Sequence, residues 1–174
     1  YQLGFNFEFD ARASLPPFRD SLPVEKTRAL TPRPIEKLTV GAPIDAKLMA
    51  QGIFRENDAS LPKAARMYTA FLSAKPFSAV SRTANGRHLA IGENDTADGL
   101  YFLYDLGGET AGYLSFSCDV PEDTEILVGF GEHYEDLRVR SLLGTRNFCF
   151  RFVAKKGHND FLYPFQRIGL RYLQ

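Results

Sequence analysis

The stretch that decides the fold is YFLYDLGGETAGYLSFSCDVPEDTEILVGFGE, which occupies residues 101–132. Aromatic and β-branched residues alternate in it with small or polar ones, and Gly, Pro and Asp interrupt the pattern, as is typical of β-strands joined by turns. The predicted strands after residue 100 occupy 101–109, 111–120, 125–132, 147–153, 160–165 and 170–174, with a turn at 121–124. Because no helical segment separates them, they predict an antiparallel sheet protein rather than an alternating α/β fold.

Weaker strand signals lie nearer the start of the chain. A period of two predicts a half-buried strand whose apolar residues are Leu3, Phe5, Phe7 and Phe9. Residues 44–54 are ambiguous and compatible with a strand. Two turn signals, Asn85-Gly86 and Asp98-Gly99, bound a further predicted strand at 87–91.

One short helix is predicted between residues 60 and 73. Ser60 is placed to cap its first turn, and Pro62 suits that turn because its missing N–H would be unpaired there anyway. Pro76 ends the pattern. The apolar residues that roughly follow the helical period are Ala64, Met67, Phe71 and Leu72.

Residues 11–43 differ in composition from the rest of the chain. Six of the ten prolines fall there, including Pro16-Pro17. Repeated Pro removes ladder donors and favours extended backbone, so we interpret this segment as a connector between domains. A long surface loop inside one domain is an equally good interpretation. We therefore divide the chain into an N-terminal strand and connector at 1–43 and a sandwich domain at 44–174. The predicted fold is mostly β: an antiparallel β-sandwich of jelly-roll type with one short helix and a proline-rich N-terminal connector.

The composition is that of an ordinary globular protein. The 174 residues are enough to bury a core, with 44% apolar and 24% charged residues. The formal net charge is zero, so there is no positive surplus for nucleic-acid phosphates. No apolar run approaches the ~20 residues of a membrane helix, so neither nucleic acid nor membrane is an expected partner. The chain starts at Tyr1 without a signal peptide, and we expect a piece of a longer protein.

The two cysteines are expected to be free thiols, one of them in the core. Strand alternation places Cys118 on the apolar face of its strand with Phe116 and Val120, and places Cys149 on the face opposite Phe150 and Phe152. A disulfide between them requires neighbouring strands with a suitable Cα spacing, which the sequence leaves open.

Six short motifs follow one another along the second half of the chain. They are Tyr104-Asp-Leu-Gly-Gly108, Ala111-Gly-Tyr113, Pro121-Glu-Asp-Thr-Glu125, Gly131-Glu-His-Tyr-Glu135, Gly144-Thr-Arg-Asn-Phe148 and Phe165-Gln-Arg-Ile-Gly-Leu-Arg-Tyr-Leu173. Their order and spacing resemble the β-sandwich domain that precedes the catalytic barrel in bacterial α-L-rhamnosidases of glycoside hydrolase family 78. LTPRPI at 30–35 resembles the proline-rich connector that enters that domain. The resemblance covers residues 28–174 and is best after residue 100.

The resemblance implies that this chain is one domain of a larger enzyme and that another domain carries the catalytic residues. In such enzymes the catalytic carboxylates lie on an (α/α)6 barrel that follows the sandwich, so this chain is expected to contain no catalytic residue. Its expected partners are the catalytic barrel and the neighbouring domains of the same polypeptide, with carbohydrate as a further candidate. The resemblance also implies a periplasmic or extracellular location.

The motif residues are of a structural type. Gly107 and Gly108 suit a positive φ or a β-bulge after Asp105. Arg167 and Arg171 are candidates to pair with Asp105 or Glu132 across strands. We therefore expect these motifs to serve as scaffold.

The residues with most potential for chemistry form one cluster at the end of a predicted strand. They are the carbohydrate-contact candidates Glu132, His133, Tyr134, Glu135 and Asp136. Glycoside hydrolysis needs two carboxylates that face each other across the sugar, and these residues show no distinctive spacing for that role. The alternative is a solvated loop after a strand.

Signals for metals and cofactors are weak. No cofactor is predicted; GENDTADG at 92–99 offers oxygen ligands that suit Ca²⁺, but its spacing is not that of an EF-hand, and a plain turn is the alternative. His88, His133 and His158 are too far apart in the sequence to indicate a metal triad.

Three functions remain open at this stage. The first is a non-catalytic sandwich that supports a catalytic barrel and lends a loop to the rim of its sugar site. The second is an independent carbohydrate-binding module, which the Tyr residues favour. The third is a sandwich used for contacts with other proteins.

Overall fold

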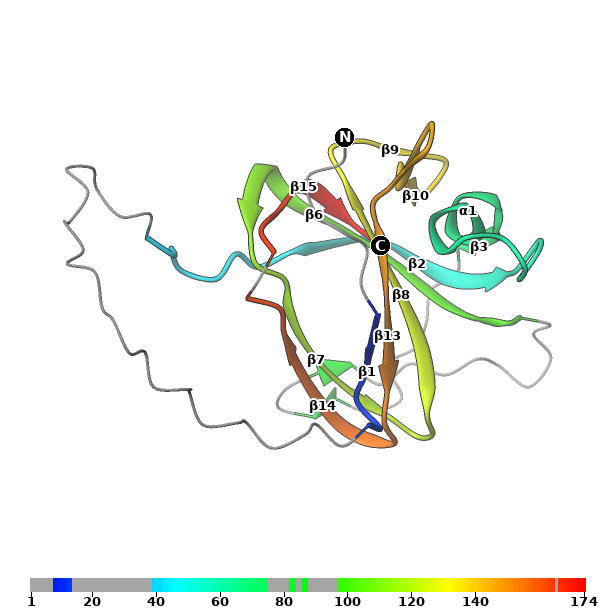
Figure 1. Cartoon of the computed structure of the whole chain (residues 1–174), viewed down its shortest axis with the longest axis horizontal. Helices are drawn as coiled ribbons and strands as arrows, with labels where there is room; N and C mark the ends of the chain where they lie inside the picture. Colours follow the sequence, from blue (N-terminus) through cyan, green and yellow to red (C-terminus); the bar gives the residue numbers. More distant parts are fainter. Residues whose placement is uncertain (1–7, 14–38, 75–81, 84–85, 88–96, 165) are drawn as a thin grey trace, which may run out of the picture.

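The main sheet of the protein is built from strands of both halves of the chain. In this computed structural model, which describes residues 8–13, 39–74, 82–83, 86–87, 97–164 and 166–174, it has seven strands (Figure 1). Their order across the sheet is β1 (Glu8–Asp10), β13 (Cys149–Ala154), β8 (Thr124–Gly131), β15 (Ile168–Leu173), β6 (Gly99–Gly112), β2 (Lys47–Arg55) and β3 (Phe71–Ala74). Neighbouring strands are antiparallel except β1 and β13, which are parallel.

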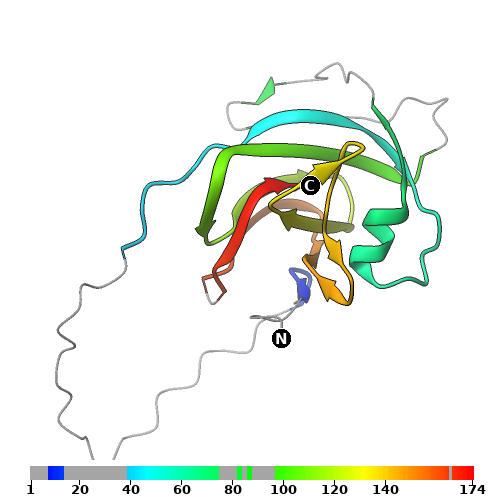
Figure 2. The same ribbon diagram turned by 90° about the horizontal axis from the view of Figure 1, so that it is seen from above.

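A second, smaller layer covers one face of this sheet. It consists of β7 (Ser115–Val120) paired with β14 (Gly157–Leu162). On the other side lie the helix α1 (Lys63–Thr69) and two short hairpins (Figure 2). These hairpins pair β9 (Tyr134–Glu135) with β10 (Arg138–Val139), and β11 (Leu142–Leu143) with β12 (Arg146–Asn147). A further pair of two-residue strands joins β4 (Arg82–Thr83) to β5 (Gly86–Arg87). The predicted β-sandwich with one short helix is confirmed.

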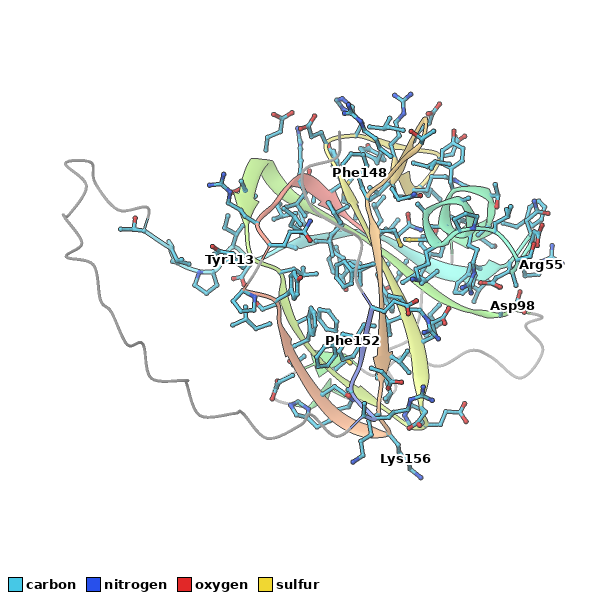
Figure 3. All side chains as sticks on the ribbon, viewed as in Figure 1. Arg55, Asp98, Tyr113, Phe148, Phe152 and Lys156 are labelled. Carbon is cyan, nitrogen blue, oxygen red and sulfur yellow. The ribbon has the colours of Figure 1, made fainter. Side chains whose placement is uncertain are left out.

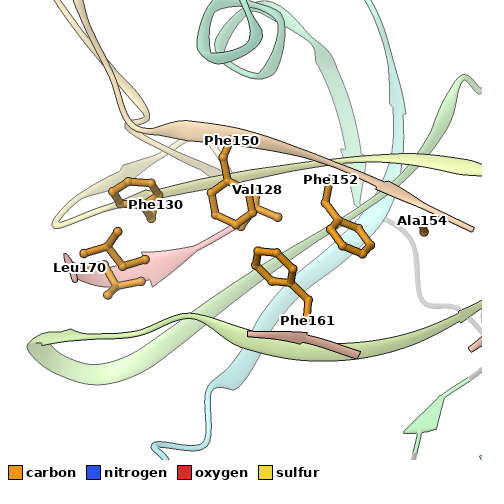
Figure 4. Close-up of a cluster of buried hydrophobic side chains, with 8 residues drawn as sticks. Val128, Phe130, Phe150, Phe152, Ala154, Phe161 and Leu170 are labelled. Carbon is orange, nitrogen blue, oxygen red and sulfur yellow. The ribbon is translucent and has the colours of Figure 1, made fainter. Parts of the chain in front are cut away.

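The core lies between the two layers and is rich in Phe. Phe152 and Phe150 of β13 point from the large sheet toward Phe161 of β14 (Figure 4). The ring of Phe152 lies 5.1 Å from that of Phe161 and 5.2 Å from that of Phe116, both in edge-to-face geometry. Phe9 of β1 stacks on Phe152 at 5.7 Å, so β1 contributes to the sandwich core. Figure 3 shows Phe152 inside the molecule, whereas Lys156 lies at the turn between β13 and β14.

A second apolar cluster lies on the outer face of the large sheet. Leu103 and Tyr172 of the sheet pack against Val139 of the β9–β10 hairpin, and all three are buried. Strand β15 serves both clusters, because Ile168 and Leu170 pack on the inner core while Tyr172 faces outward. An irregularity in the pairing of β15 with β6 between Leu170 and Tyr172 accompanies this change of face.

The two strands predicted at 101–109 and 111–120 are arranged differently. Strand β6 runs without a break from Gly99 to Gly112, and the next strand, β7, begins at Ser115. The glycines at 107 and 108 do not end β6, because the extra residues between Asp105 and Thr110 are absorbed opposite β15 as a bulge. Gly107 has the positive φ of 84° that this bulge requires, as predicted.

Helix α1 is shorter than predicted and is not capped by Ser60. The Ser60 hydroxyl donates to Asp58 Oδ1 at 2.7 Å, and Pro62 occupies the cap position without a side-chain hydrogen bond. Phe71 and Leu72, expected on the helix, belong to edge strand β3, which pairs with β2. Residues 44–54 do contain a strand, β2.

The expectation for the cysteines, no disulfide and one thiol in the core, is confirmed. The buried one is Cys149, whereas Cys118, which alternation placed on the apolar face of its strand, is partly exposed and packs on the core from β7. Alternation correctly places Cys149 on the face of β13 opposite Phe150 and Phe152. It cannot show that this second face is also covered by other elements. Helix α1 covers the face of Cys149, whose Sγ lies 3.2 Å from Met67 Sδ.

Several predictions fall outside the described residues. They concern residues 3–7, most of the connector, Pro76, most of the strand at 87–91 and most of the acidic segment at 92–99. Gly99 is described and lies in β6 opposite Phe54, rather than at a turn. The predicted turn at 121–124 is confirmed between β7 and β8.

Candidate functional site

The five carbohydrate-contact candidates lie on and beside the β9–β10 hairpin. Glu132 and His133 follow β8, Tyr134 and Glu135 form β9, and Asp136 begins the two-residue turn. Asp136 and Leu137 have φ values of 49° and 64°, which is the left-handed conformation that a tight hairpin of this length requires. The segment is thus a hairpin rather than a loose loop after a strand.

This hairpin presents its polar groups to solvent. All five candidate residues are exposed, and in the described part of the chain none of the carboxylates of Glu132, Glu135 and Asp136 forms an ion pair. Tyr134 has a different environment, because its ring meets the buried Tyr172 ring edge-to-face at 4.7 Å. The guanidinium of Arg171 lies 5.0 Å from the centre of the Tyr172 ring. The hairpin therefore offers a supported aromatic ring but no enclosed carboxylate pair.

A pocket lies elsewhere, where helix α1 meets strands β1, β8 and β13. Its volume is about 440 Å³. Five charged side chains line it: Glu8, Lys63, Arg66, Glu125 and Arg151. Leu61, Pro62 and Asn147 complete the lining. Residues far apart in the sequence thus come together here, from the first described strand to the thirteenth.

Ion pairs connect the charged residues of this pocket into one network. Arg66 Nη1 donates to Glu125 Oε1 at 2.9 Å, and Arg151 Nε donates to Glu125 Oε2 at 2.5 Å. Arg66 also binds Glu56 through Nε at 3.0 Å and through Nη2. Glu8 binds Lys63 and lies 3.8 Å from Arg151 Nη1. The network joins α1 to three strands of the large sheet.

The network keeps both pocket carboxylates ionised. Burial by itself raises the pKa of Glu125, but the hydrogen bonds from Arg151 and Arg66 outweigh burial and hold this pKa below its ordinary value. The hydrogen bond from Lys63 lowers the pKa of Glu8. A general acid needs a raised pKa, so these two carboxylates are unsuited to that role.

The sequence contains only a faint signal for this pocket. Lys63 and Arg66 are three residues apart, which places them on one face of a helix. Their partners Glu8 and Glu125 lie 55 and 59 residues away from them (63 − 8 and 125 − 66), and nothing in a single sequence links residues at such distances. The pocket residues were therefore missed.

The described residues give no support to a metal site. Among them, no group of three or more His, Cys, Asp or Glu side chains could hold a metal ion. Asp98, the described carboxylate of the acidic segment at 92–99, accepts a hydrogen bond from Glu56 N at 2.8 Å. Arg55 and Asp98 lie at the same end of the molecule, where β2 and β6 meet (Figure 3). Across the described ranges, no helix has the length and apolar character needed to cross a lipid bilayer.

Comparison with known proteins yields one structural similarity. No protein-family model matches the sequence, and no curated protein matches it. The structure is similar to part of the crystal structure of a GH78 family rhamnosidase of Bacillus sp. GL1, with a TM-score of 0.45 and 25% sequence identity. The similarity covers 61% of this chain and 11% of that chain, so this chain corresponds to a small part of that protein's length.

Proposed function

We propose that this chain is a non-catalytic β-sandwich domain of a rhamnosidase-like glycoside hydrolase, where it supports the catalytic barrel. One observation carries the proposal: motif residues that are far apart in the sequence meet as a single structural unit. Asp105 accepts hydrogen bonds from Gly107 N at 2.8 Å and from Arg171 Nε and Nη2 at 3.1 and 3.2 Å. The first and the last of the family-like motifs thus fix each other at the bulge of β6.

The chemistry of the pocket agrees with a supporting role. Glu8 and Glu125 are held ionised by cations, whereas glycoside hydrolysis needs one protonated carboxyl group. We place the catalytic carboxylates on the barrel of the same polypeptide. The location that this proposal implies is periplasmic or extracellular.

Exposed apolar side chains supply candidate contacts with a neighbouring domain. Tyr113 and Leu162 remain 43% and 61% exposed. Tyr113 precedes β7, and Leu162 pairs with Ser115 at the same end of the β7–β14 layer. We propose that the catalytic barrel or another domain covers this end, because exposed apolar side chains that gather at one place on a surface mark contact sites.

Deletion in the joined polypeptide tests the supporting role. Removing residues 101–174 from a polypeptide that carries both this domain and the barrel should abolish hydrolysis of an aryl α-L-rhamnoside and lower the thermal unfolding midpoint of the barrel. A deletion variant that stays folded and keeps full activity contradicts the proposal. The double substitution of Tyr113 and Leu162 by Ser, tested in the same polypeptide, should reproduce part of the loss.

A second candidate function is an independent carbohydrate-binding module that uses the hairpin. The observation that favours it is Tyr134, which is 43% exposed and held from below by Tyr172. A half-exposed, immobilised aromatic ring suits stacking against the C–H face of a sugar. Calorimetric titration with L-rhamnose and with polysaccharides tests it. A binding heat that is lost in the Tyr134→Ala variant supports a carbohydrate-binding module at the hairpin. No binding heat at millimolar sugar contradicts this second function.

A further inference from the structure

We infer that the pocket between α1, β1, β8 and β13 is a binding site for a neutral polyhydroxylated small molecule, a single monosaccharide unit. The volume of about 440 Å³ lies in the lower part of the range of about 300–1,000 Å³ that small-molecule sites occupy. The inference goes beyond the supporting role proposed above, and it concerns a different surface from the β9–β10 hairpin.

The polar groups of the pocket are held in place before any ligand arrives. Glu125 is fixed from two sides, by Arg66 through Oε1 and by Arg151 through Oε2. Arg66 is in turn fixed by Glu56. Ordering a long side chain on binding weakens affinity, and here the ion pairs order these side chains before a ligand arrives. Planar carboxylate and guanidinium groups fixed in this way are well suited to pairs of adjacent hydroxyl groups.

The charge balance of the network favours a neutral ligand. Three cations, Lys63, Arg66 and Arg151, face three carboxylates, and the charges sum to zero (+3 − 3). A charged ligand would add an uncompensated charge to this balanced network, which is costly in a partly buried site. The carboxylate partners are Glu8 and Glu125, which line the pocket, and Glu56, which pairs with Arg66 from outside the lining.

The network also leaves both donors and acceptors for a hydroxyl-rich ligand. Both ion pairs of Glu8 involve Oε1, so Oε2 takes part in neither of them. Arg151 bonds Glu125 through Nε, and its Nη1 is 3.8 Å from Glu8, beyond hydrogen-bond distance. A hydroxyl group donates and accepts at once, so it can bind between such groups.

An apolar edge completes the site. Leu61 and Pro62, which precede α1, line the pocket beside the charged groups. A pyranose ring has hydroxyl groups at its periphery and C–H groups on its faces, so it matches a site with one polar wall and one apolar edge.

Chemical-shift mapping by NMR tests the inference on the whole chain. The probes are L-rhamnose and D-glucose, with D-glucuronate as a charged sugar of similar size. We expect saturable shifts with a neutral sugar, at millimolar concentrations, in the amides of residues 61–66 and in the Nε–H signals of Arg66 and Arg151. Glucuronate should bind at least tenfold more weakly.

Matched arginine variants test the role of the network. Arg151→Lys keeps the charge but removes the planar fork, and it should weaken sugar binding at least tenfold. Arg12→Lys is the control, because Arg12 is also ion-paired, to Asp10 at 2.7 Å, but lies outside the pocket lining. Loss of dispersion in the NMR spectrum of Arg151→Lys would mean that this variant does not fold. Lys63→Gln then replaces it, and the chemical-shift map of the unmodified chain still decides whether the sugar binds in the pocket.

Each contrary result has its own meaning. Shifts confined to residues 132–139 would move the sugar to the hairpin and overturn the pocket site. Tighter binding of glucuronate would overturn the argument from charge balance. No saturable shift with either neutral sugar would overturn the inference as a whole. None of these outcomes bears on the supporting role, which the domain deletion tests separately.

Discussion

At the scale of single residues, Asp105 determines the geometry of β6 near its bulge. Its carboxylate accepts hydrogen bonds from Gly107 N and from Arg171 Nε and Nη2. These bonds hold the pKa of Asp105 below its ordinary value of 3.8. The hydrogen bond from Arg171 is the largest cause, and the hydrogen bond from Gly107 N is the second. The Gly-Gly step beside Asp105 is a local signal, and from it the sequence predicted a positive φ or a bulge. The ion pair with Arg171 was one of several pairings that the sequence left open, because the two residues are 66 positions apart.

Asp105→Asn should therefore lower stability in a pH-dependent way. Since the folded pKa is depressed, the stability that the carboxylate contributes is present above the unfolded pKa and is lost as the pH falls through the folded pKa. Urea unfolding should show a lower midpoint for the variant at pH 7, and the difference from the unmodified chain should shrink in strong acid. Glu135→Gln, at an exposed carboxylate, is the control. Equal midpoints for Asp105→Asn and the unmodified chain at pH 7 contradict the prediction.

The two cysteines should differ in reactivity. Burial raises the pKa of Cys149 to about 12, so at pH 8 on the order of 10⁻⁴ of it is thiolate. Burial, followed by Asp119 and Asp160, also raises the pKa of Cys118, but this thiol is partly exposed. We expect iodoacetamide to label Cys118 slowly and Cys149 only after unfolding, as read by peptide mass spectrometry. Equal labelling of both in the folded protein speaks against the buried position of Cys149.

At the scale of elements, the outer edge of the large sheet depends on the close approach of β2, β3 and β6. Gly52 of β2 lies opposite Ala74 and Tyr101 in the two ladders. A Cβ atom at this position would overlap the Ser73 carbonyl oxygen and lie 2.7 Å from Tyr101 Cε1. The backbone oxygen cannot move aside without opening the β2–β3 ladder.

Gly52→Ala should destabilise the protein by about 1–3 kcal/mol, the usual range for overpacking, and toward its upper end because the clash is with backbone. Denaturant unfolding measures the change. Gly112→Ala is the matched control, since a Cβ at Gly112 meets nothing within 4 Å. If both variants have the same stability, the close approach at Gly52 does not exist in solution.

Helix α1 illustrates where local patterns stop being informative. The sequence predicted a helix here correctly, from Pro62 and the spacing of Ala64 and Met67. It misplaced Phe71 and Leu72 because a helical period and a short edge strand are not distinguishable over so few residues. Their true environment is set by β2, which pairs with them across the sheet.

At the scale of the whole molecule, β1 joins the beginning of the described chain to its C-terminal third. It pairs in parallel with β13, and Phe9 packs on Phe152 and Phe161 at 5.7 and 5.5 Å. The ion pairs of Glu8 with Lys63 and Arg151 add a second attachment. This short strand therefore belongs to the sandwich.

Phe9→Ala should lower the free energy of unfolding by about 2 kcal/mol, less than the 3–5 kcal/mol of a fully buried Phe because Phe9 is only partly buried. Phe71→Ala is the control, since Phe71 is 59% exposed, and it should change stability by no more than about 0.5 kcal/mol. Chemical denaturation of both variants decides. A loss at Phe9 no larger than at Phe71 contradicts the packing of β1 on the core.

By itself the sequence determined the strand-rich fold and the glycine-dependent bulge at Gly107. These features follow from alternation, from turn residues and from glycine, which act within a few residues or along one strand pair. Only the tertiary structure decided that β1 joins the sheet, that α1 buries Cys149, and that Glu8, Lys63, Arg66, Glu125 and Arg151 line one pocket. The physical reason is that charged side chains follow no periodic pattern in the sequence from which their ion-pair partners could be predicted. Their meeting depends on how the layers close, which is settled by the apolar core and not by the charges themselves.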